Sequence, residues 1–449
     1  MEFRWQSGEF GPTMWAFESD VGMPLFLRDS SLICIVGSQT SANSSVVMKT
    51  RVPFFSGPAE AINDRLSRLL QHHLSKTPIV KDEDGVPFAD PSSELCFSSF
   101  ASLYPKNDTS FEASLFRLGQ ALFDNMDPHV GQDVTVDVRN RISSIRRKAA
   151  LSEWLGDAVI SLVDADLKKQ SSTDSAALIF SLLSGYQIDK ACDTAMDCGS
   201  VKLATLISQA SGDFEFREDL REQLQLWREQ RIDVHVNVSI RKVYSVLAGS
   251  LDILEGSKAS SLERCPNVDP LEGLDWKRTF GMYLWYLEPM DASIAQVYES
   301  YDRAVQELPS RVAPPRPHYL ENASSQKLAF RIPSPPPSDA LFSLIRLYAD
   351  PACSLSQILS PLSFGPSPAD YSFPWHLYII LSRCMRIRDL SDRGEPEHYE
   401  ETDEDASGRR EGHSPSADLL ASYYAQQLEQ LGMLQEAIFV LLHIEGSAG

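Results

Sequence analysis

The side chains that could bind a metal or form disulfides are scattered along the chain. Seven cysteines occupy positions 34, 96, 192, 198, 265, 353 and 384, and the nine histidines are equally dispersed. Only Cys192 and Cys198 lie close together, and their spacing is neither CxxC nor CxxxxC. His72 and His73 form the sole histidine pair, but adjacent helix positions point in different directions. We expect neither a metal site nor a disulfide framework, and reduced thiols suit a cytosolic or nuclear protein.

The motifs of common enzyme active sites do not occur in this sequence. It contains no GxGxxG, GxxxxGK[ST], HExxH, GxSxG or EF-hand pattern. Glu215, Glu218 and Asp219 fall in the first turns of a predicted helix, where acidic side chains interact favourably with the helix dipole. We therefore expect no catalytic residue and no cofactor. A helical enzyme with an unrecognised site is an alternative that a polar pocket in the structure would support.

The charge balance argues against direct contact with nucleic acid. The formal net charge is −21, which repels nucleic acid and anionic lipid over most of the surface. One basic cluster opposes this trend, and it consists of Arg139, Arg141, Arg146, Arg147 and Lys148. It is either a solvated first turn of a helix or a phosphate or nucleic-acid contact, and the global charge favours the first interpretation. No apolar run reaches the ~18–20 residues that span a bilayer, so we expect no membrane insertion.

The N-terminal segment differs in kind from the rest of the chain. Residues 1–55 contain short apolar runs such as SLICIVG and SVVMKTRV, separated by Gly, Pro, Ser and Asn, which predict strands and turns. Three or four such strands do not form a stable domain alone, so we expect them to pack on the helices or on another chain. Trp5 and Trp15 have little core of their own here and are candidate anchors for a partner.

From residue 57 onward the helical period dominates, and the expected fold is mainly α. Helices are predicted over residues 61–74, 111–123, 138–167, 176–183, 188–196, 203–210, 213–227, 240–248, 276–287, 294–305, 339–348, 355–359, 375–387, 416–431 and 434–443. Residues 77–93 are expected to form a loop, as are the Pro-rich segment 309–338 and the acidic segment 395–413. No fixed repeat occurs, so the array is an irregular α-solenoid. Such an array without a chemical site suggests a scaffold or adaptor.

Six segments carry a resemblance to a known family. They are LSEWL (151–155), LLSGYQIDKAC (182–192), LATLISQASGD (203–213), FREDLREQLQLWRE (216–229), LDWKRTFGMYLWY (274–286) and AIFVLLHI (437–444). Over residues 140–445 the chain resembles the scaffold nucleoporin that forms the C-terminal product of an autoproteolysed precursor. This is the ninety-six-kilodalton nucleoporin of vertebrates and the C-fragment of nucleoporin one-forty-five of fungi, and the composition favours the fungal form.

The resemblance implies the architecture of an ancestral coatomer element one, a solenoid folded back on itself. Residues 1–55 would then be a three- to four-stranded β-blade, 56–175 the first trunk helices and 176–290 the crown. Residues 291–449 would be the returning trunk helices, with the Pro-rich and acidic loops and a truncated tail. The precursor's cleavage site and the family's N-terminal extension are absent from this sequence, so we expect a chain trimmed at the front.

The resemblance also implies specific partners. Such proteins donate the blade in trans to the open β-propeller of Sec-thirteen, which here would use Trp5, Trp15, Leu32, Ile33, Ile35, Val36 and Val47. The crown pairs with the crown of a nucleoporin of the eighty-four or one-oh-seven type, and candidate contacts are Ile188, Leu203, Leu206, Ile207 and Tyr244. The tail contacts other nucleoporins of the Y complex.

The function implied by the resemblance is structural. We expect a non-enzymatic scaffold subunit of the outer ring of the nuclear pore complex, located at the nuclear envelope and supporting nucleocytoplasmic transport and mRNA export. The alternative is a vesicle-coat scaffold of the COPII type, which has the same architecture and also donates a blade to this propeller.

Overall fold

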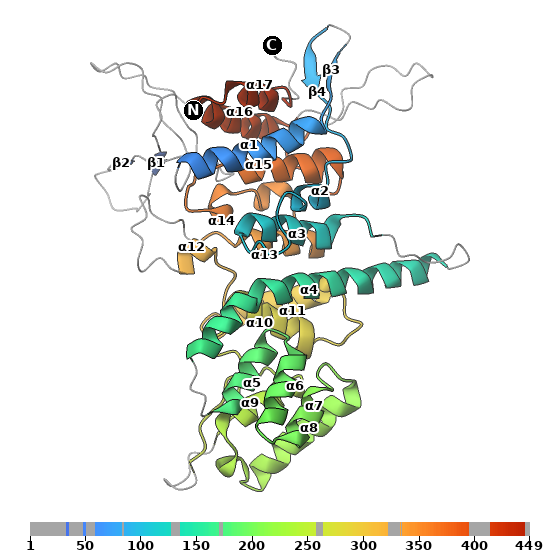
Figure 1. The fold of residues 1–449 in the computed structure, drawn as a ribbon, viewed down its shortest axis with the longest axis vertical. Coiled ribbons are helices and arrows are strands. Elements are labelled where there is room, and N and C mark those ends of the chain that lie inside the picture. The colour runs from blue at the N-terminus through green and yellow to red at the C-terminus, as the bar shows by residue number, and fades with distance from the viewer. Residues whose placement is uncertain are drawn as a thin grey trace. The chain divides into compact units, whose positions relative to one another are not determined.

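The protein is predominantly helical, as Figure 1 shows for the computed structural model. The structure describes residues 33–35, 48–50, 59–82, 85–126, 135–169, 174–256, 264–321, 333, 335–394 and 414–444. These residues contain seventeen α-helices and four short strands. The predicted mainly α class is confirmed, and the helical array fits an α-solenoid.

The chain divides into two compact units. Unit 1 comprises residues 1–105, 316–347 and 352–449, and unit 2 comprises residues 106–315 and 348–351. Unit 1 thus combines the first and last thirds of the chain, while unit 2 is almost continuous in sequence.

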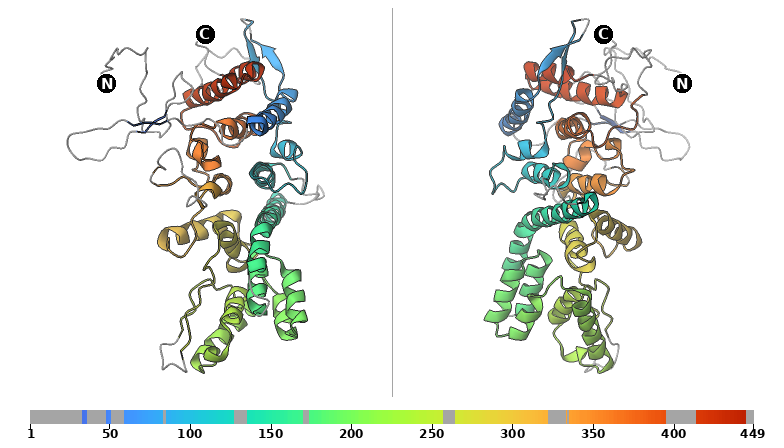
Figure 2. Two further views of the ribbon diagram at one scale, coloured as in Figure 1. Left: turned by 60° about the vertical axis from the view of Figure 1, so that its left-hand side comes forward. Right: turned by 90° about the vertical axis from the view of Figure 1, so that its right-hand side faces the viewer.

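Unit 1 is built from helices at both ends of the chain. Its elements include α1 (Ala59–Ser75), α2 (Phe97–Ala101), α12 (His318–Glu321), α13 (Ala340–Ala349), α14 (Pro361–Phe364), α15 (Ser372–Tyr378), α16 (Pro415–Gln430) and α17 (Leu434–Leu441). A π-helical turn, Ile379–Cys384, continues α15. Trp375 is fully buried, and its ring lies 4.9 Å from the ring of His73 and 5.4 Å from that of Tyr424. Helices α1, α15 and α16 therefore share one core. Helices from the C-terminal part of the chain thus pack against α1, the first helix of the unit (Figure 2).

The prediction of a loop over residues 77–93 is wrong for the middle of this segment, which forms a β-hairpin. Strand β3 (Ile79–Lys81) pairs antiparallel with β4 (Pro87–Ala89). The Asp82 carboxylate accepts a hydrogen bond from the backbone N–H of Val86 at 2.8 Å, and Gly85 has φ +84°. Both features favour a tight reversal between two β-prone runs. The N–H of Ala89 donates to the carbonyl of Leu442 at 2.8 Å, which ties the hairpin to the end of α17.

Unit 2 contains the long helix α4 and a succession of shorter helices. Its elements are α3 (Phe111–Phe123), α4 (Val136–Lys169), α5 (Ser175–Ser184), α6 (Ile188–Asp197), α7 (Val201–Ile207), α8 (Phe214–Glu229), α9 (Val238–Leu247), α10 (Trp276–Met282) and α11 (Ile294–Glu307). A π-helical turn, Tyr283–Leu287, continues α10. The predicted cap of α8 is confirmed, because the Asp213 side chain accepts from the N–H of Phe216 at 3.0 Å. Figure 1 shows α5 to α9 gathered at one end of this unit, beside α4.

Gly249 ends α9 in a conformation that other residues adopt only with strain. Its φ is +63°, and a Cβ atom added there would lie 2.8 Å from the carbonyl oxygen of Tyr286. We expect Gly249→Ala to destabilise unit 2 by about 2–3 kcal/mol, because the left-handed conformation costs about 1–2 kcal/mol and the carbonyl must also move. Urea unfolding measures the change.

Gly199 provides the matched control for that substitution. Its φ is +75°, but a Cβ atom there would meet nothing within 4 Å. Gly199→Ala should therefore cost only the conformational part, about 1–2 kcal/mol. Equal losses for the two variants would contradict the role assigned to the Tyr286 carbonyl.

Candidate protein-interaction surface

The predicted blade segment is described at two short strands. Strand β1 (Ile33–Ile35) pairs antiparallel with β2 (Met48–Thr50), with Ile33 opposite Thr50 and Ile35 opposite Met48. Two of the seven predicted propeller contacts, Ile33 and Ile35, therefore lie on β1. The other five lie outside the described residues, and they are Trp5, Trp15, Leu32, Val36 and Val47. Antiparallel pairing is the arrangement that consecutive strands of a propeller blade require.

The predicted crown residues divide between the core and the surface. Leu203 and Ile207 are buried among the helices of unit 2, because both belong to the inward face of α7. Ile188, Leu206 and Tyr244 are half-exposed. The ring of Tyr244 lies 4.7 Å from that of Trp227, so α9 and α8 meet there. Any contact made from α7 must use its outward face rather than Leu203 and Ile207.

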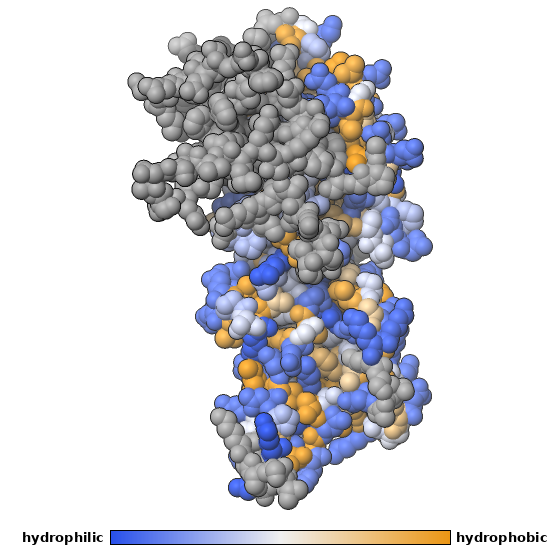
Figure 3. Space-filling view, turned by 90° about the vertical axis from the view of Figure 1, so that its left-hand side faces the viewer, coloured by the Kyte–Doolittle hydropathy of each residue, from blue (hydrophilic) through white to orange (hydrophobic). Residues whose placement is uncertain are grey.

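Several exposed apolar side chains on the same helices were missed by the sequence analysis. They are Met196, Val201, Phe214, Leu226 and Val238. Phe214 is 74% exposed, and it is the first residue of α8, directly after the capping Asp213. The sequence does contain a signal for this exposed side chain. Phe214 is a bulky apolar residue at the first position of the helix, and it lies outside the apolar stripe that contains Leu220. Figure 3 shows how apolar side chains lie among polar ones on one face of the described helices.

The turn between α5 and α6 is held by aromatic contacts. Tyr186 adopts φ +56°, and its ring stacks on Trp285 with centroids 5.0 Å apart. Tyr286 is fully buried and donates its hydroxyl proton to the carbonyl of Leu183 at 2.8 Å. Burial raises the pKa of Tyr286 well above its usual value, so the hydroxyl keeps its proton. The segment SGYQ, which carries part of the family resemblance, is therefore a structural joint between α5, α6 and the turn after α10.

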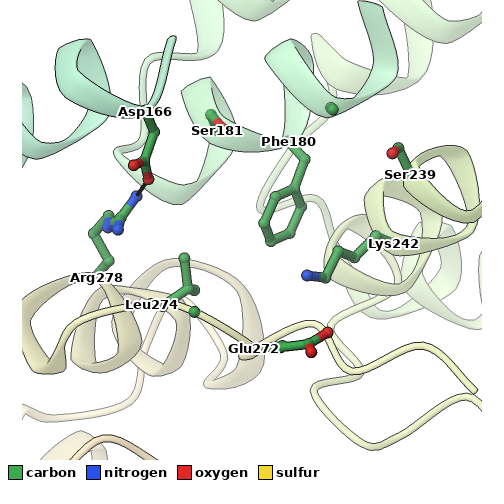
Figure 4. Close-up of a pocket in the computed structure, with 10 residues that line it drawn as sticks. Asp166, Phe180, Ser181, Ser239, Lys242, Glu272, Leu274 and Arg278 are labelled. Carbon is green, nitrogen blue, oxygen red and sulfur yellow. Dashed lines mark hydrogen bonds and ion pairs between the residues drawn. The ribbon is translucent and has the colours of Figure 1, made fainter. Parts of the chain in front are cut away.

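A small polar pocket lies between α4, α5, α9 and α10, as Figure 4 shows. Arg278 and Asp166 form an ion pair at one side of it, with Nη1 and Oδ2 2.6 Å apart. Lys242 lies over the Phe180 ring at 4.6 Å, and burial lowers the pKa of this lysine, while Glu272 and Asp269 oppose that shift. The cavity volume is about 190 Å³, below the ~300–1,000 Å³ typical of pockets for drug-sized ligands. These contacts stabilise the packing of helices and form no acid–base pair aimed at a substrate.

The structure divides the basic cluster of α4 into two groups. Arg147 donates to the carbonyls of Ala121 and Asp124 at 3.3 and 3.0 Å, where α3 ends. Lys148 donates to the carbonyls of Pro289 and Met290 at 3.0 and 3.2 Å. The pKa of Lys148 is lowered overall by burial, and the nearby carboxylates of Glu288 and Asp291 oppose this shift without cancelling it. The remaining three arginines are exposed, and they are Arg139, Arg141 and Arg146.

The described residues offer neither a metal site nor a membrane span. No group of three or more His, Cys, Asp and Glu side chains in them is arranged to hold a metal ion. No described helix combines the length and the apolar character needed to cross a bilayer. What these residues present to other molecules is a mainly helical surface with exposed apolar and charged side chains.

Comparison with known proteins identifies the family. A family model described as Nup96, nuclear protein 96, matches residues 177–449. The chain belongs to the Nup96 family. The match begins in α5 and includes all the described helices from there to α17.

Curated proteins from three kingdoms resemble this Nup96-family chain. Nucleoporin nup189 of Schizosaccharomyces pombe is 27% identical over 84% of this chain and 20% of its own length. Nuclear pore complex protein Nup98-Nup96 of Drosophila melanogaster is 26% identical over 67% of this chain and 13% of its own. Nuclear pore complex protein NUP96 of Arabidopsis thaliana is 29% identical over 58% of this chain and 24% of its own. This chain is therefore a nucleoporin of the nuclear pore complex at the nuclear envelope, and it spans a quarter or less of the length of these relatives.

Proposed function

We propose that the chain is a non-enzymatic scaffold subunit of the outer ring, or Y complex, of the nuclear pore. In this role its N-terminal strands complete the Sec-thirteen propeller in trans, and its crown helices pair with a nucleoporin of the eighty-four or one-oh-seven type. The scaffold would support nucleocytoplasmic transport and mRNA export. Membership of the Nup96 family carries the proposal, and it also favours the pore over the vesicle-coat alternative.

The paired strands β1 and β2 support the propeller assignment. A two-stranded antiparallel ribbon offers unpaired backbone groups at its outer edges, and addition to an open sheet satisfies them. An isolated ribbon of this size is marginally stable in water, so a partner sheet would supply most of its stability. We expect the complex with Sec-thirteen to bury an obligate-size interface above about 2,000 Å².

The exposed residues of α6, α7 and α8 support the crown assignment. Met196, Val201 and Phe214 leave large apolar side chains in water, and a partner helix would remove that surface from solvent. Leu203 and Ile207 hold α7 in the core from the opposite side. The crown would therefore use the outward side chains of these helices, together with the half-exposed Ile188, Leu206 and Tyr244.

Two variants test the two interfaces, and each is the control for the other. Deletion of residues 1–55 should abolish co-purification with Sec-thirteen and leave binding to the crown partner unchanged. Val201→Asp combined with Phe214→Asp should abolish binding to the crown partner and leave Sec-thirteen bound, because a charged side chain desolvated in an apolar contact is costly. Sec-thirteen retained by the deletion variant would contradict the blade assignment. Crown partner retained by the double variant would contradict the crown assignment.

A further inference from the structure

The first turns of α4 carry an apolar stripe that the described helices leave exposed. Val138 and Ile145 are 48% and 53% exposed, Ile142 is half-exposed, and Ala149 follows one turn later. The four positions are separated by four, three and four residues, which is the spacing of the apolar seam of a coiled coil. Figure 1 shows this end of α4 extending past α10 and α11.

Every position that flanks this stripe in the heptad pattern is basic. The residues next to the seam, at the e and g positions, are Arg139, Arg141, Arg146 and Lys148. In two-stranded coiled coils these positions face the equivalent positions of the partner helix and determine which partner is chosen. Lys148 donates to the carbonyls of Pro289 and Met290, so we call the four apolar residues together with Arg139, Arg141 and Arg146 the α4 seam.

The opposite face of the same turns is fixed to unit 2. Arg147 caps the end of α3 through the carbonyls of Ala121 and Asp124. Leu151 is buried, and the indole N–H of Trp154 donates to the carbonyl of Ser114 at 2.9 Å. At 100° per residue, Arg147 and Trp154 lie on the side of the helix opposite Val138 and Ile145. The contacts with α3 therefore hold the seam outward.

We propose that the α4 seam binds an amphipathic helix of a partner protein whose apolar stripe is flanked by Glu and Asp residues. Acidic residues at the partner's flanking positions would pair with Arg139 and Arg141, and the two apolar stripes would exclude water from each other. The seam is basic, whereas the whole chain has a formal net charge of −21. The charge complementarity to an acidic partner helix is therefore confined to this part of α4.

Two other occupants are disfavoured by the same residues. A second copy of this chain would place basic flanking positions against basic ones, and like charges at these positions oppose pairing. A lipid surface is disfavoured because the seam has three large aliphatic side chains and no aromatic residue, whereas interfacial helices carry larger apolar faces with Trp, Phe or Leu. The net charge of the rest of the chain also repels anionic lipid.

Fluorescent peptides of about three heptads test the proposal on the full chain. One peptide carries Leu and Ile at its seam with Glu at every flanking position, and a matched peptide carries Lys there. We expect the Glu peptide to bind at least about tenfold more tightly than the Lys peptide, with the difference shrinking at high salt. Arg139→Glu combined with Arg141→Glu should reverse this preference, because the flanking charges of the seam are inverted.

The control variant makes the same change of net charge elsewhere. Lys202→Glu combined with Arg303→Glu alters exposed positions of α7 and α11 and should leave the peptide preference unchanged. Equal binding of both peptides to the wild-type chain, or an unchanged preference in the Arg139/Arg141 variant, would overturn the proposal. Binding to phosphatidylserine vesicles that is lost in Val138→Asp/Ile145→Asp, without binding of the Glu peptide, would show a lipid site instead and would also overturn it.

Discussion

Lowering the pH from about 7 to about 5 will destabilise unit 1 by roughly 4 kcal/mol, because at least two buried histidines must take up protons on unfolding. Burial lowers the pKa of His376 to about 3 and that of His443 to about 4, and neighbouring positive charge adds to both shifts. Burial also lowers the pKa of His73 well below its ordinary value. In the unfolded chain these groups titrate near their ordinary pKa of about 6.5.

The sign of this effect follows from which state binds more protons. Between pH 6.5 and about 4 the unfolded chain binds protons on His376 and His443, whereas the folded chain leaves both rings neutral. Stability is therefore fully present above the unfolded pKa and is lost as the pH falls toward the folded values. Each of these two rings contributes about 2 kcal/mol of the loss at pH 5.

The geometry explains why these rings stay neutral. The Nδ1 atoms of His73 and His376 lie 3.4 Å apart, so one ring donates and the other accepts, which two protonated rings could not do. His443 lies 5.3 Å from His73 and contacts the carbonyl of Phe439 through Nδ1 at 3.0 Å. Their Nε2 atoms are buried with no hydrogen-bond partner among the described residues. A second proton on any of these rings would therefore be a buried charge without a partner.

Urea unfolding followed by circular dichroism at pH 7 and 5 measures the loss. His376→Gln combined with His443→Gln removes two titrating rings, so the variant should lose about 4 kcal/mol less than the wild-type chain over this interval. The exposed His235→Gln, which removes a histidine from the surface of unit 2, serves as the control and should leave the pH dependence unchanged. Wild-type stability that is equal at the two pH values would contradict the neutral cluster.

Arg278→Met will destabilise unit 2 by about 3–5 kcal/mol, the loss typical of removing one partner from a buried ion pair. The guanidinium donates through Nε to Asp275 Oδ1 and through Nη1 to Asp166 Oδ2, both at 2.6 Å. Its side chain is only 6% exposed, and the two carboxylates are mostly shielded as well. The substitution therefore leaves two carboxylates near each other with no cation between them. It also releases the start of α10 from the end of α4.

An exposed ion pair of the same length is the matched control. Arg228 and Glu255 lie 2.6 Å apart, but the Arg228 side chain is 60% exposed. Arg228→Met should cost no more than about 1 kcal/mol, because water and salt screen such pairs. Adding Asp166→Asn to Arg278→Met should recover part of the loss, since it removes one of the uncompensated charges. Equal costs for the two arginine variants would show that the Arg278 network contributes little.

Much of the local structure was predictable from sequence periodicity. Helix α3 occupies the predicted residues 111–123, and α4 extends the predicted 138–167 by two residues at each end. Asp213 caps α8 as expected. These features depend on residues within a few turns of one another, so a local pattern contains the information. The hairpin β3–β4 was missed because its charged turn and three nearby prolines resemble a loop, and its pairing is supported by a contact with Leu442.

The sequence by itself determined the helical class, the position of most helices and the family. The helical period of the apolar residues and the short sequence motifs are both properties of neighbouring residues in the chain. Only the tertiary structure decided which side of each helix is covered. It brought His73, His376 and His443 into one core, buried Leu203 while exposing Phe214, and turned Arg147 inward while Arg139 and Arg141 remained in water. Periodicity defines a stripe relative to its own helix axis. The neighbour that covers the stripe comes from distant residues, and the chain must fold before burial, charge pairing and the exposed α4 seam are defined.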